Sequence, residues 1–135
     1  MNLLVALAWP THVHHRLAQD WFAKKRELGF RTCPITQAGF VRITSNPSFS
    51  AQAVPVRAAV ALLEQIIRLS EHKFWPDDLS LHQALPKAMP IVGHQQVTDA
   101  YLISLAEAHG GIVATLDRAM LALGRKGLVE IAGVT

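Results

Sequence analysis

Residues 112–117 read IVATLD, and this stretch decides the fold class. A short run of apolar and β-branched residues is typical of a strand that is buried on both faces, as the strands of parallel sheets are. The run follows Gly110 and Gly111, which end a helical pattern that begins near Thr98. A helix that leads directly into a buried strand is the repeating unit of α/β proteins, so we expect this class.

The same alternation extends outward to both ends of the chain. Short apolar runs predict strands at five places: residues 3–7, 30–34, 72–75, 112–116 and 128–132. Helical spacing predicts the helices between them: residues 12–28 with Thr11 as N-cap, 35–44, 55–69, 98–109 and 118–123. The first of these helices is expected to bury Val13, Leu17, Trp21 and Leu28. The order predicts helices on both sides of a mostly parallel sheet.

The composition sets the class of protein. The chain has 135 residues, of which 50% are hydrophobic and 17% are charged, with a net charge of +3. These values fit one folded domain and exclude a disordered chain. No apolar run reaches the roughly 18 residues of a membrane-spanning helix. The apolar residues 1–10 have no basic start, so we interpret them as a core strand rather than a signal peptide. The single cysteine, Cys33, fits a reducing cytoplasm.

Two aspartates stand where α/β proteins bind ligands. Asp117 follows the strand at residues 112–116, and Asp99 lies at the start of the helix that leads into it. Open parallel sheets bind ligands beyond the carboxyl ends of their strands. Paired carboxylates at such a place are oxygen ligands for Mg²⁺ or Mn²⁺. The simpler alternative is that each aspartate only caps a helix, and the spacing alone slightly favours it.

Several motifs resemble those of PIN-domain ribonucleases, and most closely the toxin members of VapBC toxin–antitoxin pairs. The resemblance is carried by five stretches: residues 6–15, 33–42, 74–78, 97–102 and 110–118. It covers nearly the whole chain. It implies a three-layer PIN-like α/β fold in a single domain over residues 1–135, a cytoplasmic endoribonuclease activity, a cognate antitoxin as partner and a homodimer. The apolar helix at residues 55–69 also favours a homodimer.

The resemblance also implies a catalytic site. In this family four acidic positions hold one or two divalent ions, which bind the scissile phosphate and activate a water. The third and fourth positions match Asp99 and Asp117, which are therefore the expected Mg²⁺ (or Mn²⁺) ligands. Thr115 matches a small hydroxyl residue that often accompanies the last acid.

At the first two acidic positions the sequence departs from the family. Asn2 matches the Asn of an Asp-x-Asn motif, so the Asp would precede Met1, and we expect the chain to begin inside its first strand. Gln37 stands where the family usually carries Glu, and an amide brings no charge. With two carboxylates where four are expected, metal binding should be weak. The alternative function is therefore a weakened or inactive PIN-fold protein that binds RNA or a protein partner.

Basic residues near these positions are candidates for RNA binding. Arg42 and Arg118 flank the expected acidic site, and His12 follows the expected first strand. Guanidinium groups bind phosphate oxygens well, but each arginine can equally face solvent. For His12 a solvent-facing position is favoured, and contact with the RNA backbone is the alternative. The tryptophans are interpreted as core or interface residues rather than base-stacking platforms: Trp9, Trp21 and Trp75.

Overall fold

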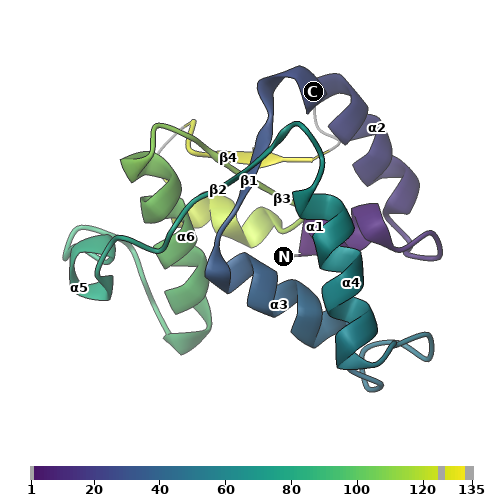
Figure 1. Cartoon of the computed structure of the whole chain (residues 1–135). Helices are drawn as coiled ribbons and strands as arrows, with labels where there is room; N and C mark the ends of the chain where they lie inside the picture. The colour runs from purple at the N-terminus through teal and green to yellow at the C-terminus, as the bar shows by residue number, and fades with distance from the viewer. Residues whose placement is uncertain (1, 125–126, 133–135) are drawn as a thin grey trace. The chain divides into compact units, whose positions relative to one another are not determined.

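The computed structural model describes residues 2–124 and 127–132. The chain divides into two compact units, Met1–Pro76 and Asp77–Thr135, which we call the N-terminal and C-terminal units. Helices and strands alternate along both, so the α/β class is confirmed (Figure 1). No helix in the described part of the chain is long and apolar enough to cross a membrane.

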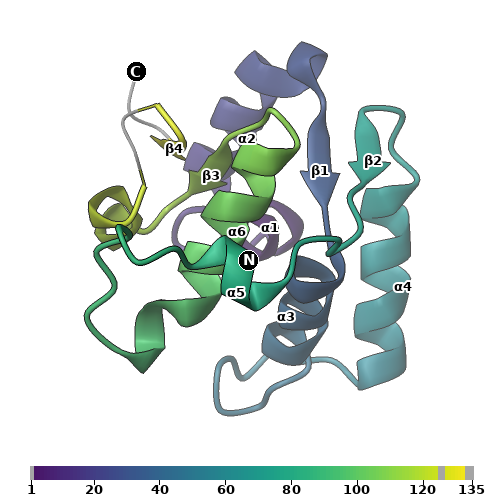
Figure 2. The same ribbon diagram turned by 90° about the vertical axis from the view of Figure 1, so that its left-hand side faces the viewer.

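The N-terminal unit joins a parallel strand pair to its helices. Its elements are α1 (Asn2–Ala8), α2 (His15–Lys25), η1 (Arg26–Leu28), β1 (Phe30–Thr32), α3 (Pro34–Thr44), α4 (Val56–Ile67) and β2 (His72–Phe74). β1 and β2 pair in parallel, with Arg31 opposite Lys73. Figure 2 shows the two strands side by side and the helices α3 and α4 that connect them. A parallel pair needs such a crossover, because its strands run in the same direction.

The C-terminal unit repeats this plan at a smaller size. Its elements are α5 (Leu81–Ala84), η2 (His94–Gln96), α6 (Val97–Ala108), β3 (Val113–Thr115), η3 (Arg118–Ala122) and β4 (Val129–Ile131). β3 and β4 pair in parallel, with Thr115 opposite Ile131. A core of four buried side chains holds α6 against η3: Ala100, Ile103, Met120 and Leu123. The helix and strand predictions for residues 98–132 are thus confirmed, although η3 is a 3-10 helix.

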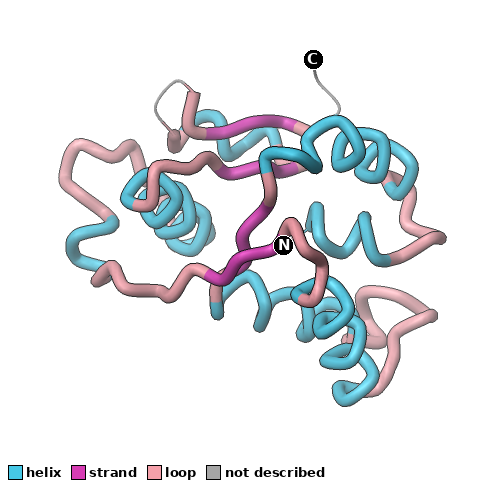
Figure 3. The backbone as a smooth tube through the Cα atoms, turned by 45° about the horizontal axis from the view of Figure 1, so that its top comes forward, coloured by secondary structure: helices cyan, strands magenta, loops and turns pink. Residues whose placement is uncertain are grey.

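The strand predicted at residues 3–7 is wrong, because this stretch forms the helix α1. A short apolar run is compatible with either structure. Leucine and alanine favour a helix, and α1 buries Leu3, Val5 and Ala6. The residues from Asn2 onward therefore do not continue a strand. Within the described residues the four strands pair two by two, one sheet in each unit, where a single central sheet was expected. Figure 3 shows how short these strands are beside the helices.

The helix predicted at residues 12–28 begins later than expected. α2 starts after His14, which is its N-cap, and the Thr11 hydroxyl instead donates to the side chain of Gln52. Val13 is 86% exposed and Leu28 is 77% exposed, so neither joins the core as predicted. Val13 lies in the turn that precedes α2, and Leu28 lies in the 3-10 turn that follows it. The apolar residues keep a helical spacing from Val13 to Leu28, but the α-helix itself covers only His15–Lys25. The spacing therefore predicted a helix that was too long at both ends.

Candidate active site

The C-terminal unit places the two expected metal ligands, Asp99 and Asp117, close enough for their charges to interact. Asp99 lies in the first turn of α6, and Asp117 is separated from the end of β3 by Leu116. Burial raises the pKa of the half-buried Asp99 carboxyl, and the negative charge of Asp117 raises it further. The two carboxylates are therefore close enough to repel each other, as neighbouring ligands of one cation would be.

Asp117 is held in place by its own turn. Its Oδ1 accepts the backbone N–H of Ala119 at 2.9 Å, which makes Asp117 the N-cap of η3. Its own backbone N–H donates to Oγ1 of the buried Thr115 at 3.0 Å. Asp117 therefore caps a helix, as the alternative interpretation predicted, but it uses only one of its two carboxylate oxygens, Oδ1, to do so. Thr115 fixes the turn, which is a positioning role.

Asp99 does not cap its helix. The N-cap of α6 is Gln96, and no donor among the described residues hydrogen-bonds to the Asp99 carboxylate. A half-buried carboxylate beside a like charge costs free energy. A bound cation would offset this cost.

The carboxylate groups of Asp99 and Asp117 suit one divalent ion. Carboxylate oxygens are the ligands that Mg²⁺ and Mn²⁺ prefer, and Mg²⁺ commonly keeps several waters. Over residues 2–124 and 127–132, no group of three or more His, Cys, Asp or Glu side chains is placed to hold a metal. The residues present therefore fit one ion held by Asp99 and Asp117, with water as the remaining ligands.

Gln37 belongs to a polar network in the N-terminal unit. Its Nε2 donates to Oγ1 of Thr32 at 3.0 Å, and the same hydroxyl lies 2.7 Å from Nε2 of His72. Burial lowers the pKa of His72, which favours its neutral ring. The amide nitrogen of Gln37 is therefore engaged with a hydroxyl that also pairs with this ring. Neither Thr32 nor His72 was predicted from the sequence as part of the site. The polar Thr32 at the carboxyl end of a strand was the available signal.

The remaining candidates divide between the two units. Asn2 and Arg42 are exposed on α1 and α3, and His12 is half-buried in the turn after α1. Arg118 is exposed beside Asp117 in the C-terminal unit. The structure thus gathers Asp99, Thr115, Asp117 and Arg118 in one unit. The catalytic, metal-binding and RNA-binding roles of these residues, in both units, stay predictions.

Comparison with known proteins identifies the family. The model of the PIN domain matches residues 2–126, which is most of the chain. The chain belongs to the PIN domain family. This PIN domain is 42% identical over 132 residues to the ribonuclease VapC39 of Mycobacterium tuberculosis, covering 97% of the chain and 95% of the relative. Two further relatives from that organism are the ribonucleases VapC38, 39% identical over 93% of the chain and 88% of the relative, and VapC29, 44% identical over 86% and 81%.

These matches confirm the resemblance found in the sequence. They span both units, so the acid pair and the Gln37 network both belong to the matched region. The relatives are ribonucleases by name, and the fold of the family is α/β, as the structure shows.

Proposed function

We propose that this PIN domain is a divalent-metal-dependent endoribonuclease, the toxin of a type II toxin–antitoxin pair. The observation that carries the proposal is the pair Asp99 and Asp117, in which a half-buried carboxylate lies beside a like charge. The names of the relatives support RNA as the substrate. The acid pair supports hydrolysis assisted by a metal ion.

Asp99 and Asp117 are the residues that would hold Mg²⁺ or Mn²⁺. When bound, such an ion neutralises charge on the scissile phosphate and lowers the pKa of a coordinated water. Thr115 holds the turn that orients Asp117, and the exposed Arg118 next to it is placed to bind a phosphate oxygen. We assign Gln37 and Asn2 to the site from their family positions, as neutral polar groups.

The proposed toxin function implies two protein partners, an antitoxin and a second copy of the chain. A VapC-type toxin requires a cognate antitoxin, and we propose that this chain binds one in the cytoplasm and acts as a homodimer. The helix α4 supports the dimer, because it is rich in apolar residues and leaves Val56 56% exposed.

A second function rests on the small number of acids. Gln37 replaces a carboxylate, and no third acid joins Asp99 and Asp117 among the described residues. Because Mg²⁺ affinity depends on ligand charge, a weakened or inactive protein that binds RNA or a protein partner is the alternative.

An RNA cleavage assay separates the two functions. The chain is incubated with RNA in Mg²⁺, in Mn²⁺ and in excess chelator. We expect cleavage only with metal, and its loss in Asp99→Asn, since the removed charge is a ligand charge. The matched control is Asp20→Asn, which changes an exposed aspartate of α2. Equal cleavage in chelator would refute metal dependence, and retained RNA binding without any cleavage would establish the alternative.

A further inference from the structure

A small pocket lies in the N-terminal unit, outside the acid pair. It encloses about 190 Å³ and is lined by Val5, Trp9, Thr11, His12, Ile43, Thr44, Phe49 and Ser50. These residues come from the end of α1, the turn after it, the end of α3 and the loop that follows α3. Every wall of the pocket therefore belongs to one compact unit.

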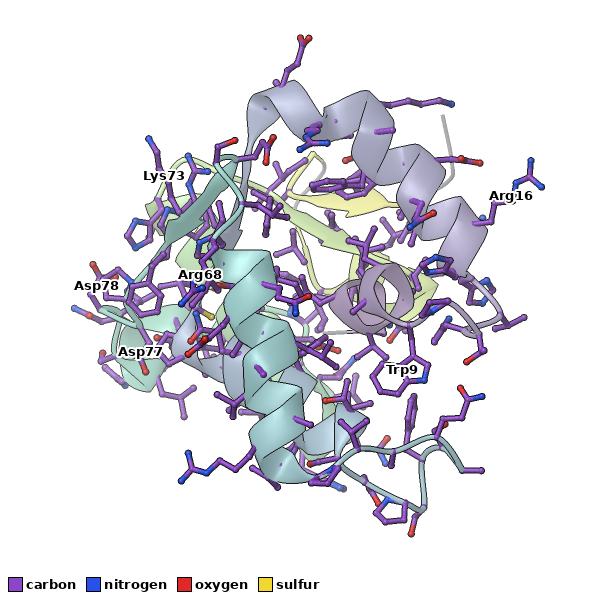
Figure 4. All side chains as sticks on the ribbon, turned by 45° about the vertical axis from the view of Figure 1, so that its right-hand side comes forward. Trp9, Arg16, Arg68, Lys73, Asp77 and Asp78 are labelled. Carbon is purple, nitrogen blue, oxygen red and sulfur yellow. The ribbon has the colours of Figure 1, made fainter. Side chains whose placement is uncertain are left out.

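Two partly exposed aromatic side chains, Trp9 and Phe49, line the pocket. Phe49 is 54% exposed and Trp9 is partly exposed, although both are large and apolar. Figure 4 shows the Trp9 ring extending from the end of α1 toward the loop that follows α3. Exposed aromatic rings around a cavity are typical of sites that stack a flat ligand.

The polar groups of the pocket are neutral donors. Nδ1 of His12 accepts the backbone N–H of His14 at 3.0 Å, so the neutral ring carries its proton on Nε2. Oγ of Ser50 accepts the backbone N–H of Gln52 at 3.1 Å, which leaves its own proton to donate. The hydroxyl of Thr44 is already used, because it donates to the carbonyl of Phe40 at 2.8 Å. A ligand with carbonyl oxygens would accept from Nε2 of His12 and Oγ of Ser50.

The volume limits the ligand to one ring. An apolar cavity of about 150 Å³ holds a benzene molecule, so about 190 Å³ accommodates one six-membered ring with its substituents. Drug-sized ligands need roughly 300 Å³ or more. A pyrimidine base fits this volume.

The charge of the unit favours a nucleic acid as the source of that ring. Residues 1–76 contain nine Lys and Arg against four Asp and Glu, a net charge of +5. Residues 77–135 contain four against six, a net charge of −2. Phosphate groups are attracted to the unit that carries the pocket, and so bring bases near the exposed rings.

We propose that this pocket binds a pyrimidine base of single-stranded RNA, stacked on Trp9 and Phe49, with His12 and Ser50 donating to its carbonyl oxygens. The proposal rests on the proposed function for its choice of RNA. It gives His12 a definite role and assigns Trp9 to base stacking, in place of the core or interface role predicted from sequence. RNA-binding proteins commonly recognise unpaired bases by stacking on aromatic side chains together with hydrogen bonds to the edges of the bases.

The test measures binding without cleavage. The intact chain is titrated, in chelator, with a short fluorescent oligouridylate and with an abasic oligomer of the same length and charge. We expect tighter binding of the oligouridylate, and we expect Phe49→Ala to weaken it about fivefold or more, since stacking is the contact removed. Binding of the abasic oligomer should not change. The matched control is Phe74→Ala, because Phe74 is 51% exposed in the same unit but lies outside the pocket.

Two further variants keep the test decisive. Trp9→Ala should have the same effect as Phe49→Ala, provided that circular dichroism shows a folded chain. Asp99→Asn should keep the preference for the oligouridylate while losing cleavage, so the failure of one proposal is distinguishable from failure of the other. Equal affinity for the two oligomers, or unchanged affinity in Phe49→Ala, would overturn the proposal whatever else enters the pocket.

Discussion

Asp99 is a half-buried carboxylate in the first turn of α6, and it interacts with the second acid, Asp117. Because its pKa is raised in the folded chain, its charged form is disfavoured there, and Asp99→Asn should raise the thermal unfolding midpoint in chelator at pH 7. The same change should lower Mn²⁺ affinity at least about tenfold, as changes at metal sites commonly do. Calorimetry with and without Mn²⁺ measures both effects.

Asp20→Asn is the matched control, since Asp20 is exposed on α2. It should change neither quantity. A loss of stability in Asp99→Asn without metal would show that Asp99 has a structural role after all.

His72 makes the N-terminal unit sensitive to acid. Burial, with a contribution from Arg31, lowers its pKa, so the folded chain binds this proton less readily than the unfolded chain. The stabilisation is complete above about pH 6.5, the ordinary pKa of histidine, and is lost as the pH falls toward the lowered folded value. We expect the free energy of unfolding to fall over this range, and His72→Gln to reduce the fall while keeping an acceptor for Thr32.

The measurement is urea unfolding at a series of pH values. His82→Gln is the control, because His82 is exposed on α5. If the control flattens the pH profile as much as His72→Gln does, the acid sensitivity does not arise at β2.

At the scale of elements, one turn sets the pairing of β1 with β2. Gly29 has φ +73° and ψ 168°, a backbone conformation that is accessible almost only to glycine. A Cβ there would lie 3.0 Å from the carbonyl oxygen of Glu71, the group that accepts the N–H of Phe30. Gly29→Ala should therefore destabilise the chain by about 1–3 kcal/mol, measured by chemical unfolding. Gly93→Ala is the control, because a Cβ at Gly93 meets nothing within 4 Å. An equal effect of both would contradict the assignment.

At the scale of the whole molecule, charge is divided between the units, and RNA binding should depend strongly on salt. Arg42 is an exposed cation of the +5 unit, so Arg42→Ala should weaken binding of all single-stranded RNA sequences alike and reduce the slope against log salt by about 1. Fluorescence titration at several salt concentrations measures the slope. Lys87→Ala, an exposed change in the −2 unit, should leave it unchanged. A sequence-selective loss in Arg42→Ala would indicate base contact instead.

Features with local causes could be predicted from the sequence alone. Pro34 starts α3, because proline suits the first turn of a helix, and Gly110 and Gly111 follow the end of α6. The run at residues 112–116 contains β3, and Asp117 lies just beyond it, separated from the strand by Leu116. Asp99 and Asp117 could be proposed as a pair for the same reason, since the start of a helix and the end of the strand that follows it are visible in the sequence.

Only the tertiary structure decided the features that depend on partners distant in sequence. The apolar run at residues 3–7 suits a strand or a helix equally, and the surroundings that bury Leu3 and Val5 make it a helix. Thr32 and His72 stand 40 residues apart and meet because β1 and β2 pair. The aromatic pocket likewise needs Trp9 and Phe49 from separate segments. Burial and strand pairing depend on the whole packed unit, whereas caps and strand ends depend on a few neighbouring residues.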